Sequence, residues 1–306
     1  MNAIEKMIKD IVKYSHINDE SSIRDRLLNE YTLSGINVLE DFYNFKQNHD
    51  INYFEYNENM DIFYTQTDGF LFELAAWHCT YDRWRWKINL LTDIKKRFKK
   101  KDLKILLIGD GLGFDSLFLY QNLKNIEITY FEFEDSKSFN FAKNMFIDNN
   151  AEIKQIGKLN EIKQNYYDVV ICLDVLEHIA SPKIIINNIY DYLNNKGVTY
   201  ISEAFGAVEL LRPTHLKSNI KYVGKIINMF KEEGYTFLDK LIPRIYIFTK
   251  DKQKKIGFIQ YFKIALKELL ISFYFKLRYK NKSVDELDQT YNIIITQLSY
   301  LSNEKK

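Results

Sequence analysis

The stretch Ile105-Leu-Leu-Ile-Gly-Asp-Gly-Leu-Gly113 decides the fold class of this chain. Its apolar residues are typical of a buried strand, and glycines follow at positions 109, 111 and 113. Glycine has no Cβ, so a ligand can approach the backbone closely where a strand turns into a helix. The stretch therefore predicts a parallel α/β sheet with a ligand-binding loop at the end of its first strand.

A second stretch of the same character is Tyr167-Asp-Val-Val-Ile-Cys-Leu-Asp-Val-Leu-Glu-His178. It is an apolar strand that ends in carboxylates and an imidazole. Ligands collect outside the carboxyl ends of parallel strands, because the loops there converge on one edge of the sheet. The two stretches together predict a nucleoside-bearing cofactor that lies across this edge.

The spacing of the glycines separates two kinds of nucleotide site. A dinucleotide-binding loop has the pattern G-x-G-x-x-G, whose third glycine would fall where this chain has Phe114. The observed G-x-G-x-G pattern instead resembles the first motif of class I S-adenosylmethionine-dependent methyltransferases. The second stretch, ending in Asp174-Val-Leu-Glu-His178, resembles the fourth-strand segment of the small-molecule branch of that family. The resemblance covers residues 100–250, about one domain's worth of chain.

The resemblance implies an α/β fold, a Rossmann-like doubly wound sheet with a reversed last strand. Alternating strand and helix patterns in the chain favour the same architecture. The pattern predicts strands over residues 104–108, 126–132, 153–156, 169–173, 198–202, 235–241 and 244–249, a turn over 194–197, and helices over 71–86, 136–149, 182–193, 218–233 and 284–301.

We expect three regions along the chain. Residues 1–100 would form a helical N-terminal cap, residues 101–250 the cofactor-binding core, and residues 251–306 a helical C-terminal extension. Within the extension, residues 258–277 form an amphipathic pattern at helical spacing. We expect this segment to make either a homodimer contact or a peripheral membrane contact.

The resemblance assigns the cofactor contacts residue by residue. Gly109, Gly111 and Gly113 would lie under the methionine and ribose parts of the cofactor. The helix that follows, from about Phe114, would present free N–H groups and its positive dipole end to the methionine carboxylate. The family usually carries an acid at the position of Leu107.

Three acids are candidates for the remaining cofactor contacts. Asp110 either replaces the missing acid near the methionine amine or serves only as a turn residue. Glu132 ends the second strand, where a carboxylate can accept both ribose hydroxyls, and we favour it over Glu134. Asp174 would contact the methionine amine or the floor of the cleft.

Two histidines are candidates for catalysis. His178 could take a proton from an acceptor hydroxyl, or it could fix its loop by hydrogen bonding. His215 lies in the loop after the fifth strand, where substrate-contacting residues often lie in this fold, and the alternative is a histidine that only faces solvent. A sulfonium methyl group is already activated, so we expect no metal, and alignment of the reactants could suffice.

Composition narrows the class of protein. The chain has 306 residues, of which 46% are hydrophobic and 27% charged, as expected for a globular protein with a buried core. Cys79 and Cys172 show no disulfide or zinc spacing. We see no signal-peptide pattern and no run long enough for a membrane helix, and we therefore expect a cytoplasmic enzyme.

Charge is distributed unevenly. Residues 250–282 hold ten basic and two acidic residues, a net +8, so the remainder of this chain of net charge +2 carries −6. An acidic body argues against nucleic acid as the substrate, as does the lack of an Asn/Asp-Pro-Pro-aromatic motif. We therefore expect methyl transfer to oxygen or nitrogen of a small molecule, such as a sugar, lipid or secondary metabolite. The alternative is a catalytically silent binding or assembly protein on the same fold.

Overall fold

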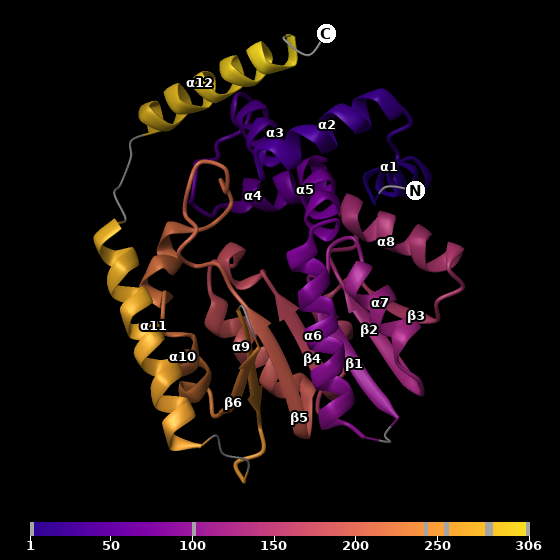
Figure 1. Cartoon of the computed structure of the whole chain (residues 1–306), viewed down its shortest axis with the longest axis vertical. Helices are drawn as coiled ribbons and strands as arrows, with labels where there is room; N and C mark the ends of the chain where they lie inside the picture. Colours follow the sequence, from indigo (N-terminus) through magenta and orange to yellow (C-terminus); the bar gives the residue numbers. More distant parts are fainter. Residues whose placement is uncertain (1–2, 100–101, 242–243, 254–256, 279–283, 304–306) are drawn as a thin grey trace.

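The computed structural model describes residues 3–99, 102–241, 244–253, 257–278 and 284–303, and is shown in Figure 1. The predicted boundary between residues 100 and 101 lies outside the described residues. A seven-stranded sheet forms the centre, in the order β3-β2-β1-β4-β5-β7-β6. Its strands are β1 (Leu103–Ile108), β2 (Ile126–Phe131), β3 (Ile153–Ile156), β4 (Tyr167–Leu173), β5 (Leu193–Ser202), β6 (Thr236–Leu241) and β7 (Ile245–Thr249).

The direction of the strands confirms the predicted fold class. Strands β1 to β5 run parallel, whereas β7 is antiparallel to β5 and is inserted between β5 and β6. The last strand is therefore reversed, as expected. All the parallel strands end at the same edge of the sheet, which is where a ligand-binding site forms in folds of this kind.

Helices cover both faces of the sheet, because alternate strand residues point to opposite sides. Ile105 and Leu107 belong to a core shared with α6, α7 and α8, while Leu106 and Ile108 belong to a second core shared with α9 and α10. This is the doubly wound arrangement. The covering helices are α6 (Tyr81–Arg97), α7 (Phe114–Asn122), α8 (Lys137–Asp148), α9 (Pro182–Tyr192) and α10 (Ile226–Glu232).

The N-terminal helices cover the carboxyl edge of the sheet (Figure 1). They are α1 (Ala3–Tyr14), α2 (Glu20–Thr32), α3 (Ile36–Lys46), α4 (Glu58–Gln66) and α5 (Gly69–His78). Ile8 and Phe72 share the core of the first sheet face, whereas α3 and α4 build a separate core around Phe42 and Phe63. The C-terminal helices are α11 (Phe258–Arg278) and α12 (Val284–Asn303).

The structure corrects three local predictions. The helix expected over residues 71–86 is two helices: α5 ends at His78, and Thr80 caps the start of α6 by accepting the N–H of Arg83. The helix expected over 218–233 is a 3-10 turn followed by α10, broken at Gly224, whose φ is 70°. The turn expected over 194–197 lies within β5, as a stretch where the pairing with β4 shifts register.

Candidate active site

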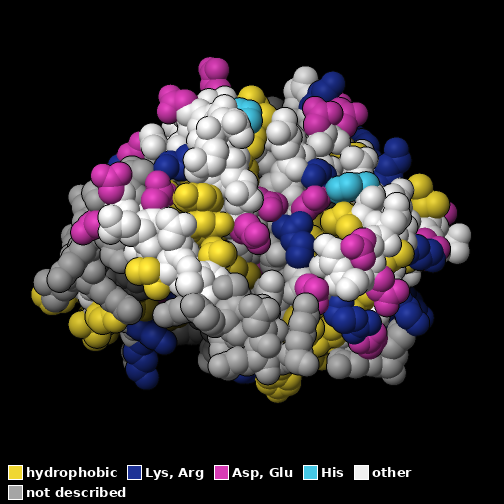
Figure 2. All heavy atoms as spheres, turned by 90° about the horizontal axis from the view of Figure 1, so that it is seen from above, with side chains coloured by type: hydrophobic (Ala, Val, Ile, Leu, Met, Phe, Trp, Pro, Cys, Tyr) yellow, Lys and Arg dark blue, Asp and Glu magenta, His cyan; other side chains and the backbone are white. Residues whose placement is uncertain are grey.

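A cavity of about 630 Å³ lies between the cap and the carboxyl edge of the sheet. Figure 2 looks down on this side of the molecule and shows acidic and basic side chains gathered near its middle. The ends of β1 and β4, helices α5 and α6, and the loop after β5 all contribute to the cavity. Its polar lining includes Glu73, His78, Asp82, Arg83, Arg85, Asp110, Asp115, Asp174, Glu177, His178, Glu209, Arg212, Thr214, His215 and Arg244.

The glycine loop has the backbone that its sequence predicts. Gly109, Gly111 and Gly113 have φ values of 69°, 54° and 75°, in the left-handed region that favours glycine. Side chains of this chain lie against the loop: a Cβ at Gly109 would come within 2.5 Å of Val175, and one at Gly111 within 2.5 Å of Leu74. The cavity reaches Gly109, and Leu74 of α5 covers the next part of the loop.

Asp110 caps helix α7. Its carboxylate accepts the backbone N–H of Asp115 at 3.2 Å and that of Ser116 at 2.7 Å, and the Ser116 hydroxyl at 2.6 Å. These N–H groups are among those that we expected to face a methionine carboxylate. Burial, followed by the charge of Asp115, raises the pKa of Asp110 to about 7.

The two acids considered for the ribose lie in different surroundings. The Glu132 carboxylate accepts the N–H of Gly111 at 3.2 Å and that of Phe133 at 3.0 Å, so it is anchored to the glycine loop. Burial raises its pKa. Glu134 is exposed and lies 3.9 Å from Lys158. The geometry therefore favours Glu132 as the acid at the loop.

Arg83 of α6 is a buried cation with unused donors. Only 6% of the residue is exposed, and one terminal nitrogen donates to Asp115. Its Nε and Nη1 have no hydrogen-bond partner within the described part of the chain. Lys87 lies nearby, with its Nζ 3.6 Å from Asp115. Because Arg83 lines the cavity, its free N–H groups can bind an anionic ligand there.

Asp174 lies directly after β4 in a conformation that is rare for residues other than glycine, with φ of 55°. Ser202, at the end of β5, donates its hydroxyl to the Asp174 carboxylate at 2.8 Å. The Asp174 N–H donates to the Ser202 carbonyl at 3.2 Å. Strain of this kind persists where the surrounding structure imposes it, and it is common at functional sites.

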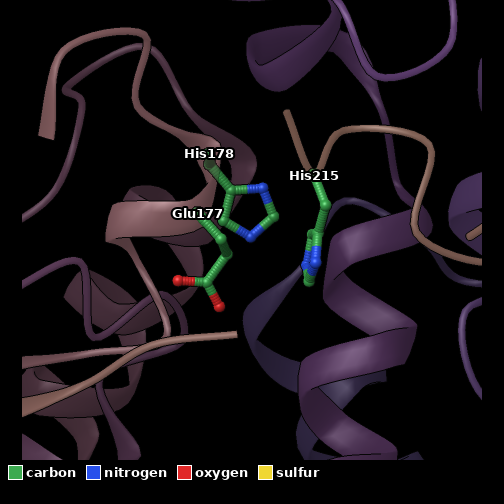
Figure 3. Close-up of side chains that lie close together, drawn as sticks. All are labelled: Glu177, His178 and His215. Atoms are coloured by element: carbon green, nitrogen blue, oxygen red, sulfur yellow. The ribbon is translucent and has the colours of Figure 1, made fainter. Parts of the chain in front are cut away.

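His178 and His215 both line the cavity, and Figure 3 shows their rings close to each other. Their rings are perpendicular, with centroids 4.6 Å apart. His178 Nδ1 lies 3.1 Å from the Tyr64 hydroxyl and 3.2 Å from that of Thr214. Burial lowers the pKa of His178 to about 4 and that of His215 well below its usual value. Both imidazoles are therefore neutral at physiological pH.

Glu177 completes this group (Figure 3). Its Oε2 and the Nδ1 of His215 lack hydrogen-bond partners among the described residues. Burial, followed by the charge of Asp174, raises the pKa of Glu177 well above its usual value. Ligand atoms of Glu177, His178 and His215 lie within 4.8 Å of one another, so small side-chain movements would let them hold a transition-metal ion.

Comparison with known proteins decides the family. A model of the family described as "Methyltransferase domain" matches residues 79–238, more than half of the chain. The chain belongs to this family. No curated protein matches its sequence significantly.

Solved structures of methyltransferases resemble the chain at low identity. A presumed S-adenosyl-L-methionine-dependent methyltransferase from Methanococcus maripaludis is 21% identical over 55% of this chain and 86% of its own, with a TM-score of 0.43. A presumed O-methyltransferase from Nostoc punctiforme is 15% identical over 74% of this chain and 71% of its own, with a TM-score of 0.47.

The chain is a class I methyltransferase, an enzyme family whose methyl donor is S-adenosylmethionine. Its structure brings Gly109, Asp110, Asp174, His178 and His215 to one cavity, as the sequence predicts. The cavity lining does not include the described residues Gly111, Gly113 and Glu132. Leu74 lies against Gly111, and Phe146 and Ala142 of α8 lie against Gly113.

Sequence reasoning missed two charged residues of this methyltransferase site. Glu73 of α5 forms an ion pair with Arg212 at 2.8 Å, and burial raises its pKa to about 7. Arg83 belongs to a polar group that follows Trp77 in the sequence, with His78, Tyr81 and Asp82, and this group alone assigns it no ligand. For Glu73 the signal was a charge inside the otherwise apolar sequence of α5. Arg83 lies among other charged residues at the start of α6, and the sequence alone connects neither residue to a partner.

Proposed function

We propose that this methyltransferase transfers the methyl group of S-adenosylmethionine to an oxygen or nitrogen of a small molecule held in the cavity. The observation that carries the proposal is one cavity that joins the glycine loop to a pair of neutral histidines. Its volume of about 630 Å³ lies within the range of small-molecule sites.

The part of the cavity next to the end of β1 has residues that suit the methionine part of the cofactor. The free N–H groups of Arg83 suit its carboxylate, since charge-assisted hydrogen bonds to an anion are the strongest available there. Arg83 takes the role that we expected for the start of α7, because the Asp110 carboxylate already accepts backbone N–H groups there. Asp174 lines the same cavity and suits the methionine amine.

Glu132 suits the ribose, because its carboxylate lies at the glycine loop. Leu74 covers Gly111 in this structure, so the ribose requires a rotation of this side chain. Leu74 belongs to the cap helix α5, and its movement would couple cofactor entry to the cap.

The cofactor supplies a methyl group bound to a positively charged sulfur. The protein aligns the acceptor with this methyl group and excludes water beneath the cap. When the acceptor oxygen or nitrogen forms its bond to the methyl carbon, the carbon–sulfur bond breaks and its electron pair stays on sulfur. The acceptor proton passes to Nε2 of His178 in the neutral tautomer whose Nδ1 carries the ring proton and faces the Tyr64 and Thr214 hydroxyls.

The test is transfer of labelled methyl groups from S-adenosylmethionine to a fractionated small-molecule extract. We expect one small-molecule fraction to become labelled, with calorimetric binding of the cofactor. Absence of any heat with S-adenosylmethionine or its demethylated product would refute the proposal. Cofactor binding without any labelled acceptor would favour the silent binding protein instead.

A further inference from the structure

Helix α11 lies along the outside of the molecule, beside the edge of the sheet formed by β6 (Figure 1). One side of the helix is fixed to the core. Ile264 and Ile271 pack against the second core cluster. Glu268 is only 5% exposed, and its carboxylate accepts from Lys240 at 2.7 Å and from the Tyr246 hydroxyl at 2.5 Å. These contacts set the rotation of α11 about its axis.

The opposite side of α11 is apolar and exposed. Leu266, Leu269, Leu270 and Phe273 have exposed fractions of 46%, 65%, 61% and 63%. Their spacing places them on one face over two turns of the helix. Single exposed apolar residues are normal, whereas a continuous apolar strip of this kind marks an interaction surface.

The exposed charged residues that α11 carries beside this strip, among those described, are lysines. Lys263 and Lys267 are exposed on α11, and Glu268, the acid in the sequence of this helix, is turned into the protein. Residues 250–282 carry a net charge of +8, although the whole chain carries only +2. The surface therefore combines large apolar side chains with lysines, which is the pattern of helices that lie in the interface of an anionic bilayer.

We propose that α11 binds the surface of a membrane containing anionic lipids. Leu266, Leu269, Leu270 and Phe273 enter the boundary between headgroups and acyl chains, and the lysines contact the lipid phosphates. The helix lies on the bilayer: none of the described helices is long and apolar enough to cross a membrane. A second copy of the chain is a poorer partner, because pairing two such faces would bring like charges together.

The test uses the full chain and two kinds of vesicle, phosphatidylcholine alone and an equal mixture of phosphatidylcholine and phosphatidylglycerol. We expect co-sedimentation with the mixed vesicles, little with the neutral ones, and loss of binding at high salt. The double variant Leu269→Glu/Leu270→Glu should reduce the partition coefficient at least about tenfold. The matched control is Ile147→Glu/Ile184→Glu, which changes two similarly exposed residues on α8 and α9.

The contribution of charge is tested separately. Lys263→Gln/Lys267→Gln should weaken binding to the mixed vesicles about tenfold, whereas Lys95→Gln/Lys96→Gln on α6 should not change it. Circular dichroism and calorimetric binding of S-adenosylmethionine verify that each variant is folded. The membrane proposal and the proposed methyl transfer can fail independently, because vesicle binding needs no methyl acceptor.

Two results would overturn the proposal. The first is equal binding of the wild type and the Leu269→Glu/Leu270→Glu variant, or no binding of either, to the mixed vesicles. The second is sedimentation of the wild type as a dimer that the same variant dissociates, without vesicle binding. In that case a second copy covers this face of α11.

Discussion

The two ends of the cavity differ in the charge state of their side chains. At the β1 end, the Arg83 cation and the Asp115 anion are paired, and free N–H groups remain for a ligand. At the β4–β5 end, burial lowers the pKa of His178 and raises that of Glu177, so both prefer to be uncharged. One end therefore offers charged donors to an anionic group, and the other offers uncharged carboxyl and imidazole groups.

The largest expected effect is at the uncharged end. We expect His178→Gln to lower the turnover number about a hundredfold, because a positioned general base contributes about that much or more. Cofactor affinity should stay unchanged, since Arg83 lies at the other end of the cavity. Steady-state kinetics and calorimetry measure the two quantities, with the exposed His16→Gln as the control. Unchanged turnover would leave His178 as a residue that only fixes its loop.

Removal of metal tests whether turnover depends on an ion bound by Glu177, His178 and His215. Dialysis against a chelator should leave turnover unchanged, because the sulfonium methyl group is already activated. Loss of activity that zinc or iron restores would instead make Glu177, His178 and His215 metal ligands.

The second prediction concerns Glu203, the residue directly after β5, and the stability of the fold at different pH. Burial, followed by the charges of Glu268 and Asp174, raises the pKa of Glu203 from 4.5 to about 7. The folded state therefore keeps a proton that the unfolded state loses above pH 4.5, so the free energy of unfolding falls as pH rises toward 7. Glu203→Gln should remove about 2 kcal/mol of this decrease.

Urea unfolding at pH 5 and at pH 8 measures this difference. The exposed Glu161→Gln is the control and should keep the wild-type pH dependence. An unchanged pH dependence in Glu203→Gln would show that water reaches this carboxyl.

The third prediction concerns the charged end. Arg83→Lys keeps the charge but loses the N–H groups that point away from Asp115, so the affinity for S-adenosylmethionine should fall about tenfold. Calorimetry measures the dissociation constant. Arg97→Lys, at the other end of α6, should change the affinity less than about twofold. Equal affinity in wild type and Arg83→Lys would show that the methionine carboxylate of the cofactor does not bind this arginine.

The contrast between the two ends of the cavity also explains which features of the fold and of the site could be predicted from the sequence. The glycine loop and the apolar strands are local patterns, so their positions follow from the sequence alone. The partner of Arg83 is Asp115 on another helix, and it becomes visible only when α6 packs on α7. Asp110 was expected near the cofactor amine or in a turn, and it caps α7 because Ser116 lies within its reach.

The same distinction holds for the histidines. His178 follows a strand and could be placed at the sheet edge, whereas the contact with His215 depends on a long loop. Asn219 holds this loop by donating to the backbone carbonyls of Leu176, Glu177 and Ile179. No local pattern in the sequence indicates such a contact.

The smallest expected effect lies between the two ends, at Leu74. This side chain covers Gly111, so the ribose can reach Glu132 only when Leu74 rotates. Leu74→Ala should tighten cofactor binding about threefold and speed association, because the covering side chain is gone. Stopped-flow fluorescence and calorimetry measure the two quantities, with the exposed Leu28→Ala on α2 as the control. Weaker binding in Leu74→Ala would mean that this leucine packs against the bound cofactor, and that the two ends communicate through α5.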